Sequence, residues 1–161
     1  MHAITIKQPW AYAICHLGKR IENRTWKPSE KLIGQRVAIH AGSTTDYDAF
    51  AWMGERGLTR DVTHDALPAC QALGAVVATA LLVGYAEETK SGRPVVMGGA
   101  HRIAEAFTHE QIRLWWMGPI GHVLADLRVL ATPIPCKGQL GYWRLPADVE
   151  AEVLRQEASD G

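Results

Sequence analysis

The densest group of side chains that could do chemistry lies at residues 19–24, which read KRIENR. A lysine at a turn and an arginine two residues after a glutamate can meet a phosphate or the polar edge of a base, and arginine offers a planar fork for either. Glu22, held beside Lys19 and Arg24, would stay ionised and could take a proton or orient a water. The same spacing fits a strand with a solvated face of ion pairs, and spacing alone favours that explanation.

Two of the six tryptophans, Trp10 and Trp26, flank this charged group. A base that stacks on an aromatic face contributes roughly 1–3 kcal/mol to nucleic-acid binding. Trp26 shares the predicted face of Glu22 and Arg24, so a stacking role and a packing role are equally open for it. The remaining tryptophans are better explained by packing in a core.

His40 and Lys137 are further candidates for ligand contacts. His40 ends a predicted strand just before Gly42, a position that can face a cleft. Lys137 lies in the proline-stiffened turn PIPCKG at residues 133–138, from which it could reach a phosphate. Taken singly, His40 is more easily explained as a structural histidine, and Lys137 as a surface lysine.

The histidines and cysteines predict neither a metal site nor a disulfide. Seven histidines show no recognised ligand spacing, and Cys15, Cys70 and Cys136 are far apart without a C-x-x-C pair. We therefore expect no metal and no cofactor, in a reducing cytosol. Residues 1–5 do not resemble a signal peptide, and the most apolar stretch, residues 75–83, is far shorter than a membrane helix needs. A cytoplasmic protein with no membrane partner is predicted.

The composition is that of a globular domain without a broad basic surface. Of 161 residues, 47% are hydrophobic, and 17 basic side chains balance 17 acidic ones. We therefore do not expect a broad basic surface that coats duplex DNA non-specifically, whereas a local basic cleft is compatible with this balance.

The elements that must position these residues alternate irregularly between strands and short helices. Helices are expected at residues 9–17, after a cap at Ser43 or Thr44, and at residues 108–116. Strands are expected at residues 20–26, 34–41, 74–84, 121–131 and 141–145, and a long glycine-rich loop at residues 87–101. This order predicts an α+β fold rather than a parallel βαβ sheet. Residues 147–161 are expected to form a charged, helix-prone, peripheral tail.

Four short motifs, in order, resemble the ASCH family of the PUA-like superfamily over nearly the whole chain. Residues 4–11 look like its opening strand and helix, and residues 34–41 like the next strand. Lys19, Glu22 and Arg24 keep the K-x-x-E-x-R part of its signature, although Leu17 stands where the signature has glycine. Residues 133–138 and 142–145 resemble the closing P-x-K-G turn and strand.

The resemblance implies an open PUA-like β-barrel with short flanking helices, formed by residues 1–146, and binding of RNA or another nucleotide-containing ligand. Some family members are similar to metal-independent ribonucleases that use a cleft lysine. Others look like N4-acetylcytidine amidohydrolases, but their threonine position is Glu22 here, which counts against that activity. A non-enzymatic interaction module is a third alternative. Lys19 and Glu22 are the implied catalytic residues, and the ligand-binding candidates are Lys7, Gln8, Trp10, Arg24, Trp26, His40 and Lys137. We expect Lys19, Glu22 and Arg24 to line one solvent-accessible cleft with Trp26 at its wall, and we expect Lys19→Ala to leave the fold intact.

Overall fold

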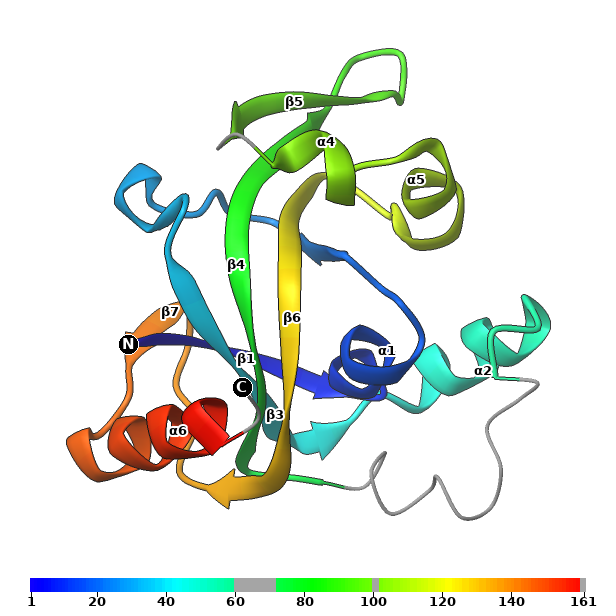
Figure 1. The fold of residues 1–161 in the computed structure, drawn as a ribbon. Coiled ribbons are helices and arrows are strands. Elements are labelled where there is room, and N and C mark those ends of the chain that lie inside the picture. Colours follow the sequence, from blue (N-terminus) through cyan, green and yellow to red (C-terminus); the bar gives the residue numbers. More distant parts are fainter. Residues whose placement is uncertain (60–71, 100–101, 160–161) are drawn as a thin grey trace. The chain divides into compact units, whose positions relative to one another are not determined.

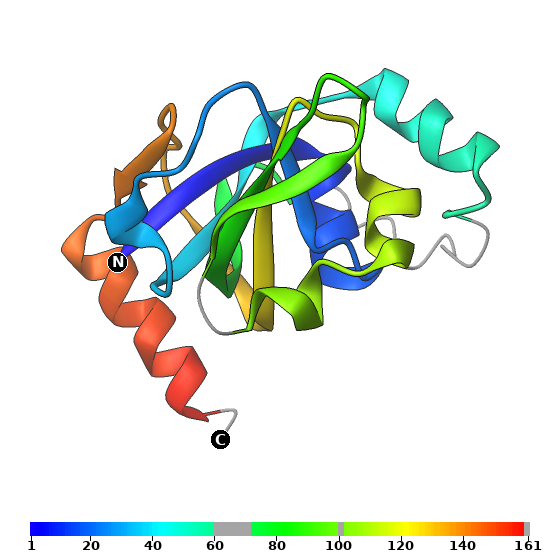
Figure 2. The ribbon, with the colours of Figure 1, turned by 90° about the horizontal axis from the view of Figure 1, so that it is seen from above.

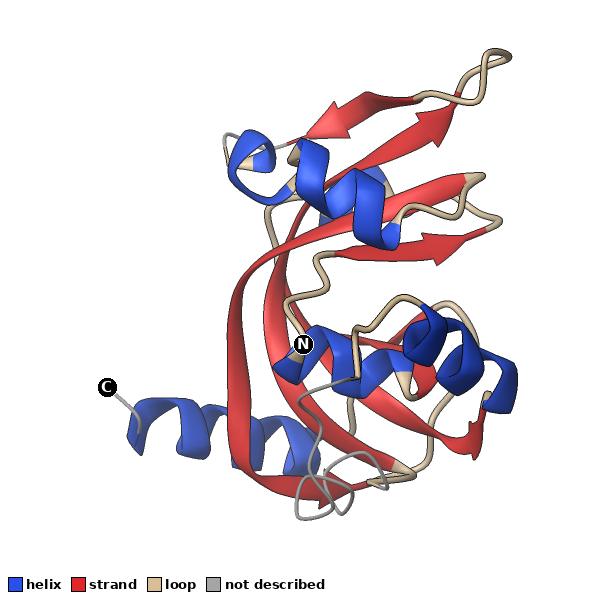
Figure 3. Cartoon of the chain, turned by 90° about the vertical axis from the view of Figure 1, so that its right-hand side faces the viewer, coloured by secondary structure: helices blue, strands red, loops and turns tan. Residues whose placement is uncertain are grey.

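The computed structural model describes residues 1–59, 72–99 and 102–159, and it has the predicted α+β composition (Figure 1). The strands are β1 His2–Gln8, β2 Ile21–Arg24, β3 Arg36–Thr45, β4 Ala75–Glu88, β5 Pro94–Gly99, β6 Ile120–Pro135 and β7 Tyr142–Arg144. The helices are α1 Trp10–His16, α2 Tyr47–Glu55, α4 Ile103–Ala106, α5 His109–Trp115 and α6 Ala147–Ser159, with a 3-10 turn at Glu30–Leu32. Figure 3 shows long strands and mostly short helices.

The chain divides into two compact units, which are described separately. Unit 1 comprises Met1–Gly18, Ala38–Thr79 and Arg128–Gly161, and unit 2 comprises Lys19–Val37 and Ala80–Leu127. Strands β3, β4 and β6 contribute residues to both units. Within the described residues, no helix is long and apolar enough to cross a membrane.

Unit 1 is built on the neighbouring strands β3, β1 and β7. β1 and β7 are antiparallel, and Ala3 lies opposite Trp143. Apolar side chains from these strands, from β4 and β6 and from α6 form one core, whose members are Ala3, Ala38, Val76, Leu130, Ile134, Trp143, Leu145, Val149 and Val153. Alternation along each strand sends these side chains to a single face.

The C-terminal segment of unit 1 is part of its core, and the expectation of a peripheral tail is wrong in this respect. Helix α6 buries Val149, Val153 and Gln156. The N-terminal ammonium of Met1 pairs with Glu150 near the start of this helix, and Figure 2 shows the N-terminus beside β7 and α6. The buried positions recur at helical spacing, so one stripe of an otherwise charged helix packs inward.

The expected cap of α2 also differs from the observed one. Ser43 and Thr44 belong to the end of β3, and Asp46 occupies the N-cap position. Its carboxylate accepts a hydrogen bond from the Ala49 backbone N–H at 3.1 Å. An aspartate accepts a hydrogen bond from a free backbone N–H of the first helical turn as well as a serine does. Thr44 and Thr45 favour strand conformation, so β3 continues to the residue before Asp46.

Unit 2 contains the antiparallel pairs β2–β6 and β4–β5. The β4–β5 hairpin corrects the expectation of a structureless loop at residues 87–101, of which 100 and 101 lie outside the described residues. A side chain at Gly98 would come within 2.7 Å of the Tyr85 ring, and one at Gly99 within 2.9 Å of Ile103. These glycines therefore allow close packing within a strand rather than marking a loop.

Candidate functional site

The predicted charged group does come together in unit 2, as three side chains on one carboxylate. The Lys19 Nζ lies 2.6 Å from Oε2 of Glu22, and a terminal guanidinium nitrogen of Arg24 lies 3.1 Å from Oε1. Both oxygens of Glu22 are thus held by cations, and the hydrogen bond from Lys19 is assisted by charge. This arrangement fixes Glu22 and orients Arg24.

Two of these three side chains are buried, contrary to the expectation that all three line a solvent-accessible cleft. Lys19 is 1% exposed and Glu22 is 6% exposed, whereas the Arg24 side chain keeps 23% of its surface exposed. Burial lowers the pKa of Lys19, and the adjacent Glu22 opposes that shift. Burial disfavours ionised Glu22, but the charges of Lys19 and Arg24 outweigh it and hold the Glu22 pKa below its ordinary value.

Strand register adds a histidine that sequence reasoning missed. β2 and β6 are antiparallel with Glu22 directly opposite His122, so both side chains lie on the same face. The His122 Nε2 donates to the backbone oxygen of Trp26 at 2.9 Å, because a carbonyl can only accept. Burial lowers the His122 pKa to about 4, although Trp26 and Glu22 favour protonation. His122 is therefore a neutral buried support for this group.

Arg24 and Trp26 form the partly exposed part of the group. The Arg24 guanidinium carbon lies 5.7 Å from the centre of the Trp26 ring, within the range of a cation–π contact. The Trp26 ring also meets the His122 ring edge-on, with the centroids 4.8 Å apart. The predicted strand was too long, because β2 ends at Arg24 and Trp26 lies in the bend that follows. Strand alternation therefore places Glu22 and Arg24 on one face, and the bend brings Trp26 to Arg24.

Helix α5 and the residues that follow it hold strand β2 in place through hydrogen bonds. The Asn23 amide donates to the Trp115 carbonyl at 2.8 Å, and its oxygen accepts from the Met117 N–H at 3.0 Å. The Arg20 N–H donates to the side-chain oxygen of Gln111 at 2.8 Å. The backbone that carries Glu22 and Arg24 is therefore rigidly positioned, as a binding site requires.

The N-terminal ligand candidates lie in unit 1, where two of them have structural partners. The Gln8 amide donates to the Ala72 carbonyl and its oxygen accepts from the Tyr12 N–H, both at 3.0 Å. The Trp10 indole donates to Asp46 at 3.2 Å. Lys7 is exposed. The ligand roles of all three stay predictions.

His40 and Lys137 both line one cavity of unit 1, with a volume of about 310 Å³. The buried His40 ring meets Trp143 edge-on at 5.5 Å between centroids. Its Nε2 donates to the Cys136 carbonyl at 3.0 Å. Two residues separated by almost a hundred positions, each singled out by the sequence, are thus brought to the same hollow.

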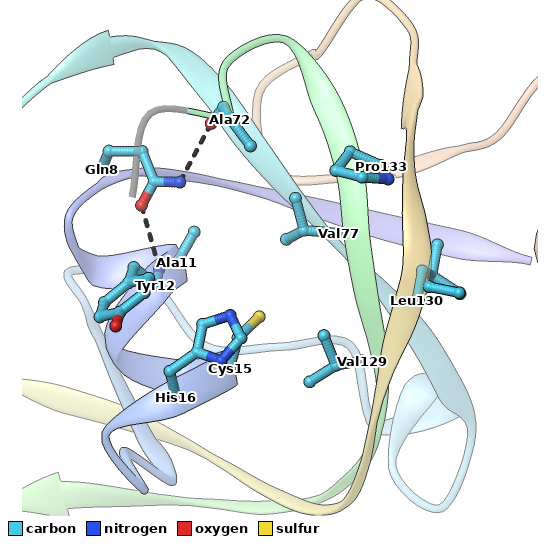
Figure 4. Close-up of a pocket in the computed structure, with 11 residues that line it drawn as sticks. Gln8, Ala11, Tyr12, Cys15, His16, Ala72, Val77, Val129, Leu130 and Pro133 are labelled. Atoms are coloured by element: carbon cyan, nitrogen blue, oxygen red, sulfur yellow. Dashed lines mark hydrogen bonds between the residues drawn. The ribbon is translucent and has the colours of Figure 1, made fainter. Parts of the chain in front are cut away.

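A second cavity of unit 1, of about 380 Å³, lies between α1 and β6 and is mostly apolar. Figure 4 shows Tyr12, Cys15 and His16 on one wall and Val129 and Leu130 on the other. The Gln8 amide closes one end through its two hydrogen bonds. Burial lowers the pKa of His16. No sequence motif marks this hollow, because apolar side chains on a helix and a strand look like ordinary core.

The described part of the chain contains no group of three histidine, cysteine, aspartate or glutamate side chains that could hold a metal ion. Cys70 lies outside the described residues. The absence of a metal and of a cofactor stays a prediction.

Comparison with solved structures shows an ASCH-like fold. No family model matches the sequence, and no curated protein matches it. The crystal structure of ASCH from Zymomonas mobilis aligns with 96% of this chain and 93% of its own, with a TM-score of 0.50 at 15% identity. Two variants of that protein align over the same share of this chain, with TM-scores of 0.48 and 0.46. The chain therefore has an ASCH-like α+β fold.

Proposed function

We propose that this chain binds RNA through unit 2, with Arg24 and Trp26 as the contact pair. The observation that carries the proposal is the partly exposed side chain of Arg24, which is held by Glu22 and whose guanidinium carbon lies 5.7 Å from the centre of the Trp26 ring. Single-stranded nucleic acid is commonly bound by a cation that meets phosphate next to an aromatic ring on which a base stacks. The ASCH-like fold is consistent with this function.

Binding accounts for the group better than cleavage does. Metal-free cleavage of RNA needs one group to deprotonate the 2′-hydroxyl and another to stabilise the charged phosphate. Both oxygens of Glu22 are already engaged, and Lys19 is buried against it. We therefore assign Lys19 and Glu22 the role of orienting Arg24.

The proposal is tested by fluorescence anisotropy with a labelled single-stranded RNA. Trp26→Leu removes the stacking face, which corresponds to a loss of about 5-fold to 150-fold in affinity. Arg24→Ala should weaken binding and flatten its dependence on salt, because fewer counterions are released on binding. Arg24→Lys keeps the charge but loses the planar fork, so we expect it to restore the salt dependence without restoring full affinity.

Arg93→Ala is the matched control, because Arg93 is an exposed arginine of the same unit. It should leave the affinity and the salt dependence close to those of the wild type. The proposal fails if Arg24→Ala and Arg93→Ala weaken RNA binding equally, because the affinity would then depend only on the overall charge of the surface.

A further inference from the structure

Strand β5 of unit 2 is an edge of the sheet. Among the described strands it pairs only with β4, and Figure 1 shows it as the outer strand of the β4–β5 hairpin. The edge at β2 is covered, because helix α5 and the residues after it form hydrogen bonds with Arg20 and Asn23. Proteins usually protect their edge strands in such ways, since free backbone groups pair with other chains.

The side chains of β5 are apolar and exposed. Val95 is 46% exposed, Val96 is 41% exposed and Met97 is 55% exposed. No residue of Pro94–Gly99 carries a charge. Neighbouring side chains of a strand point to opposite faces, so Val95 and Val96 expose apolar groups on both faces of the hairpin. A run of three exposed apolar residues on an uncharged edge is avoided unless it has a function.

The backbone direction of Val96 follows from the hydrogen bonds of the hairpin. The Thr89 N–H donates to the Arg93 carbonyl at 2.8 Å, so the backbone of Arg93 faces β4. The register is regular from Pro94 to Val96. Because backbone groups alternate in direction along an antiparallel strand, Val95 also faces β4, whereas the N–H and C=O of Val96 point away from it. Val96 therefore offers one donor and one acceptor to an additional strand.

The regular part of this edge is short. Pro94 has no backbone N–H, and the register shifts beyond Val96, between Tyr85 and Ala86 of β4. Three exposed side chains fall far short of the roughly 800 Å² that each partner buries in a stable dimer. A short extended segment gains main-chain hydrogen bonds at Val96 as well as apolar contacts, so it fits this edge better than a second copy of the chain does.

The turn of the hairpin adds positive charge beside the edge. Lys90 and Arg93 are exposed, and neither forms an ion pair within the described part of the chain. Arg93 comes three residues before Val96. In an added antiparallel strand, the residue opposite Arg93 therefore comes three positions after the residue opposite Val96. An acidic side chain at that position would form a cross-strand pair with Arg93.

We propose that the β5 edge binds a peptide segment in extended conformation, antiparallel to β5, with apolar residues opposite Val95–Met97 and an acidic residue opposite Arg93. The segment exchanges two hydrogen bonds with the backbone of Val96. This interaction is separate from the RNA contact proposed at Arg24 and Trp26, because neither of those residues belongs to the hairpin.

An NMR titration with the end-blocked peptide TVVVTE tests the site. Its middle valine lies opposite Val96 and its glutamate opposite Arg93. We expect saturable shifts of the backbone amide signals of Val95, Val96 and Met97, and slower hydrogen exchange of the Val96 N–H. The peptide TVPVTE lacks the N–H that donates to the Val96 carbonyl, so it should not bind.

An exchange of charge tests the predicted register. Arg93→Glu should weaken the binding of TVVVTE about fivefold and strengthen the binding of TVVVTK by a similar factor. Arg113→Glu is the matched control, because Arg113 is an exposed arginine of helix α5 in the same unit, and this change should affect neither peptide.

Three results would show that the proposal is wrong: TVVVTE leaves the β5 amide signals unmoved, TVPVTE binds as well as TVVVTE, or Arg93→Glu and Arg113→Glu have equal effects. Signals of β5 that shift with protein concentration alone would mean that a second copy of the chain occupies the edge, which also contradicts the proposal. Loss of RNA affinity in Arg24→Ala would bear only on the RNA contact.

Discussion

At the scale of single residues, the site depends on the buried carboxylate of Glu22. Lys19→Met removes one of its two cations and leaves a buried charge that is less well compensated. Breaking a buried ion pair typically costs 3–5 kcal/mol, and because Arg24 remains we expect about 3 kcal/mol. Urea unfolding at pH 7 measures this loss. The sequence alone predicted an exposed Lys19 whose removal leaves the fold intact, and its burial reverses that expectation.

Lys27→Met is the control for this change, because the Lys27–Glu87 pair of the same unit involves an exposed lysine. Exposed ion pairs contribute little to stability, so this variant should unfold at nearly the wild-type urea concentration. Equal unfolding midpoints for Lys19→Met and the wild type would mean that Lys19 does not stabilise the buried carboxylate.

His122 should make folding sensitive to acid. Its pKa is about 4 in the folded chain and 6.5 in the unfolded chain, so between these values only the unfolded chain takes up the proton. The stability from this neutral histidine is complete above pH 6.5 and is lost as the pH falls toward 4, by about 3 kcal/mol in all. An NMR titration of the imidazole should show a midpoint near pH 4. A midpoint near 6.5 would contradict the account.

The K-x-x-E-x-R spacing was enough to predict that Lys19, Glu22 and Arg24 meet. Glu22 and Arg24 share one face of a strand, and a turn before that strand can bring Lys19 to the same carboxylate. His122 could not be predicted in this way, since it reaches Glu22 only through the register of β2 and β6. The burial of Lys19 could not be predicted either, because a lysine before a strand is exposed in most proteins.

At the scale of elements, one side chain joins helix α6 to strand β6. The Gln156 oxygen accepts from the Thr132 N–H at 3.0 Å, and its amide nitrogen donates to the Thr132 carbonyl at 3.1 Å. Gln156→Leu leaves both backbone groups without this partner, so we expect a loss of roughly 1–3 kcal/mol in the free energy of unfolding. Chemical denaturation of the variant measures it.

Leu154→Gln is the matched control, since Leu154 is an exposed residue of the same helix. This variant should have nearly the same free energy of unfolding as the wild type. If Gln156→Leu is as stable as this control, water has replaced both hydrogen bonds, and they contribute nothing to the stability of the helix.

Most of the strands and helices could be located from the sequence pattern, but β5, α4 and the packing of the elements could not. Pro9 and Gly18 bracket α1 as predicted, and Thr108 caps α5 by accepting from the Gln111 N–H at 3.2 Å. Strand β5 was missed because glycine and proline normally mark loops. Here Gly98 leaves room for the Tyr85 ring and Gly99 leaves room for Ile103. These are tertiary contacts, which a local sequence pattern does not predict.

At the scale of the whole molecule, four short motifs predicted an ASCH-like fold that structural comparison confirms at only 15% identity. Their order along the chain was informative, whereas each motif alone was not. The boundary between residues 1–146 and 147–161 stays a prediction, although α6 shares the core of unit 1. Balanced charge, with 17 basic and 17 acidic residues, requires any RNA contact to be local.

The most direct test of RNA binding at Arg24 and Trp26 is an NMR titration of the indole N–H signals with single-stranded RNA. The tryptophans are built-in reporters, because Trp26 is partly exposed whereas Trp115 and Trp143 are buried. We predict a saturable shift of the Trp26 signal, with those of Trp115 and Trp143 unmoved, and loss of the shift in Arg24→Ala. RNA that binds without moving the Trp26 signal, or an RNA titration without any response, would contradict the proposed function.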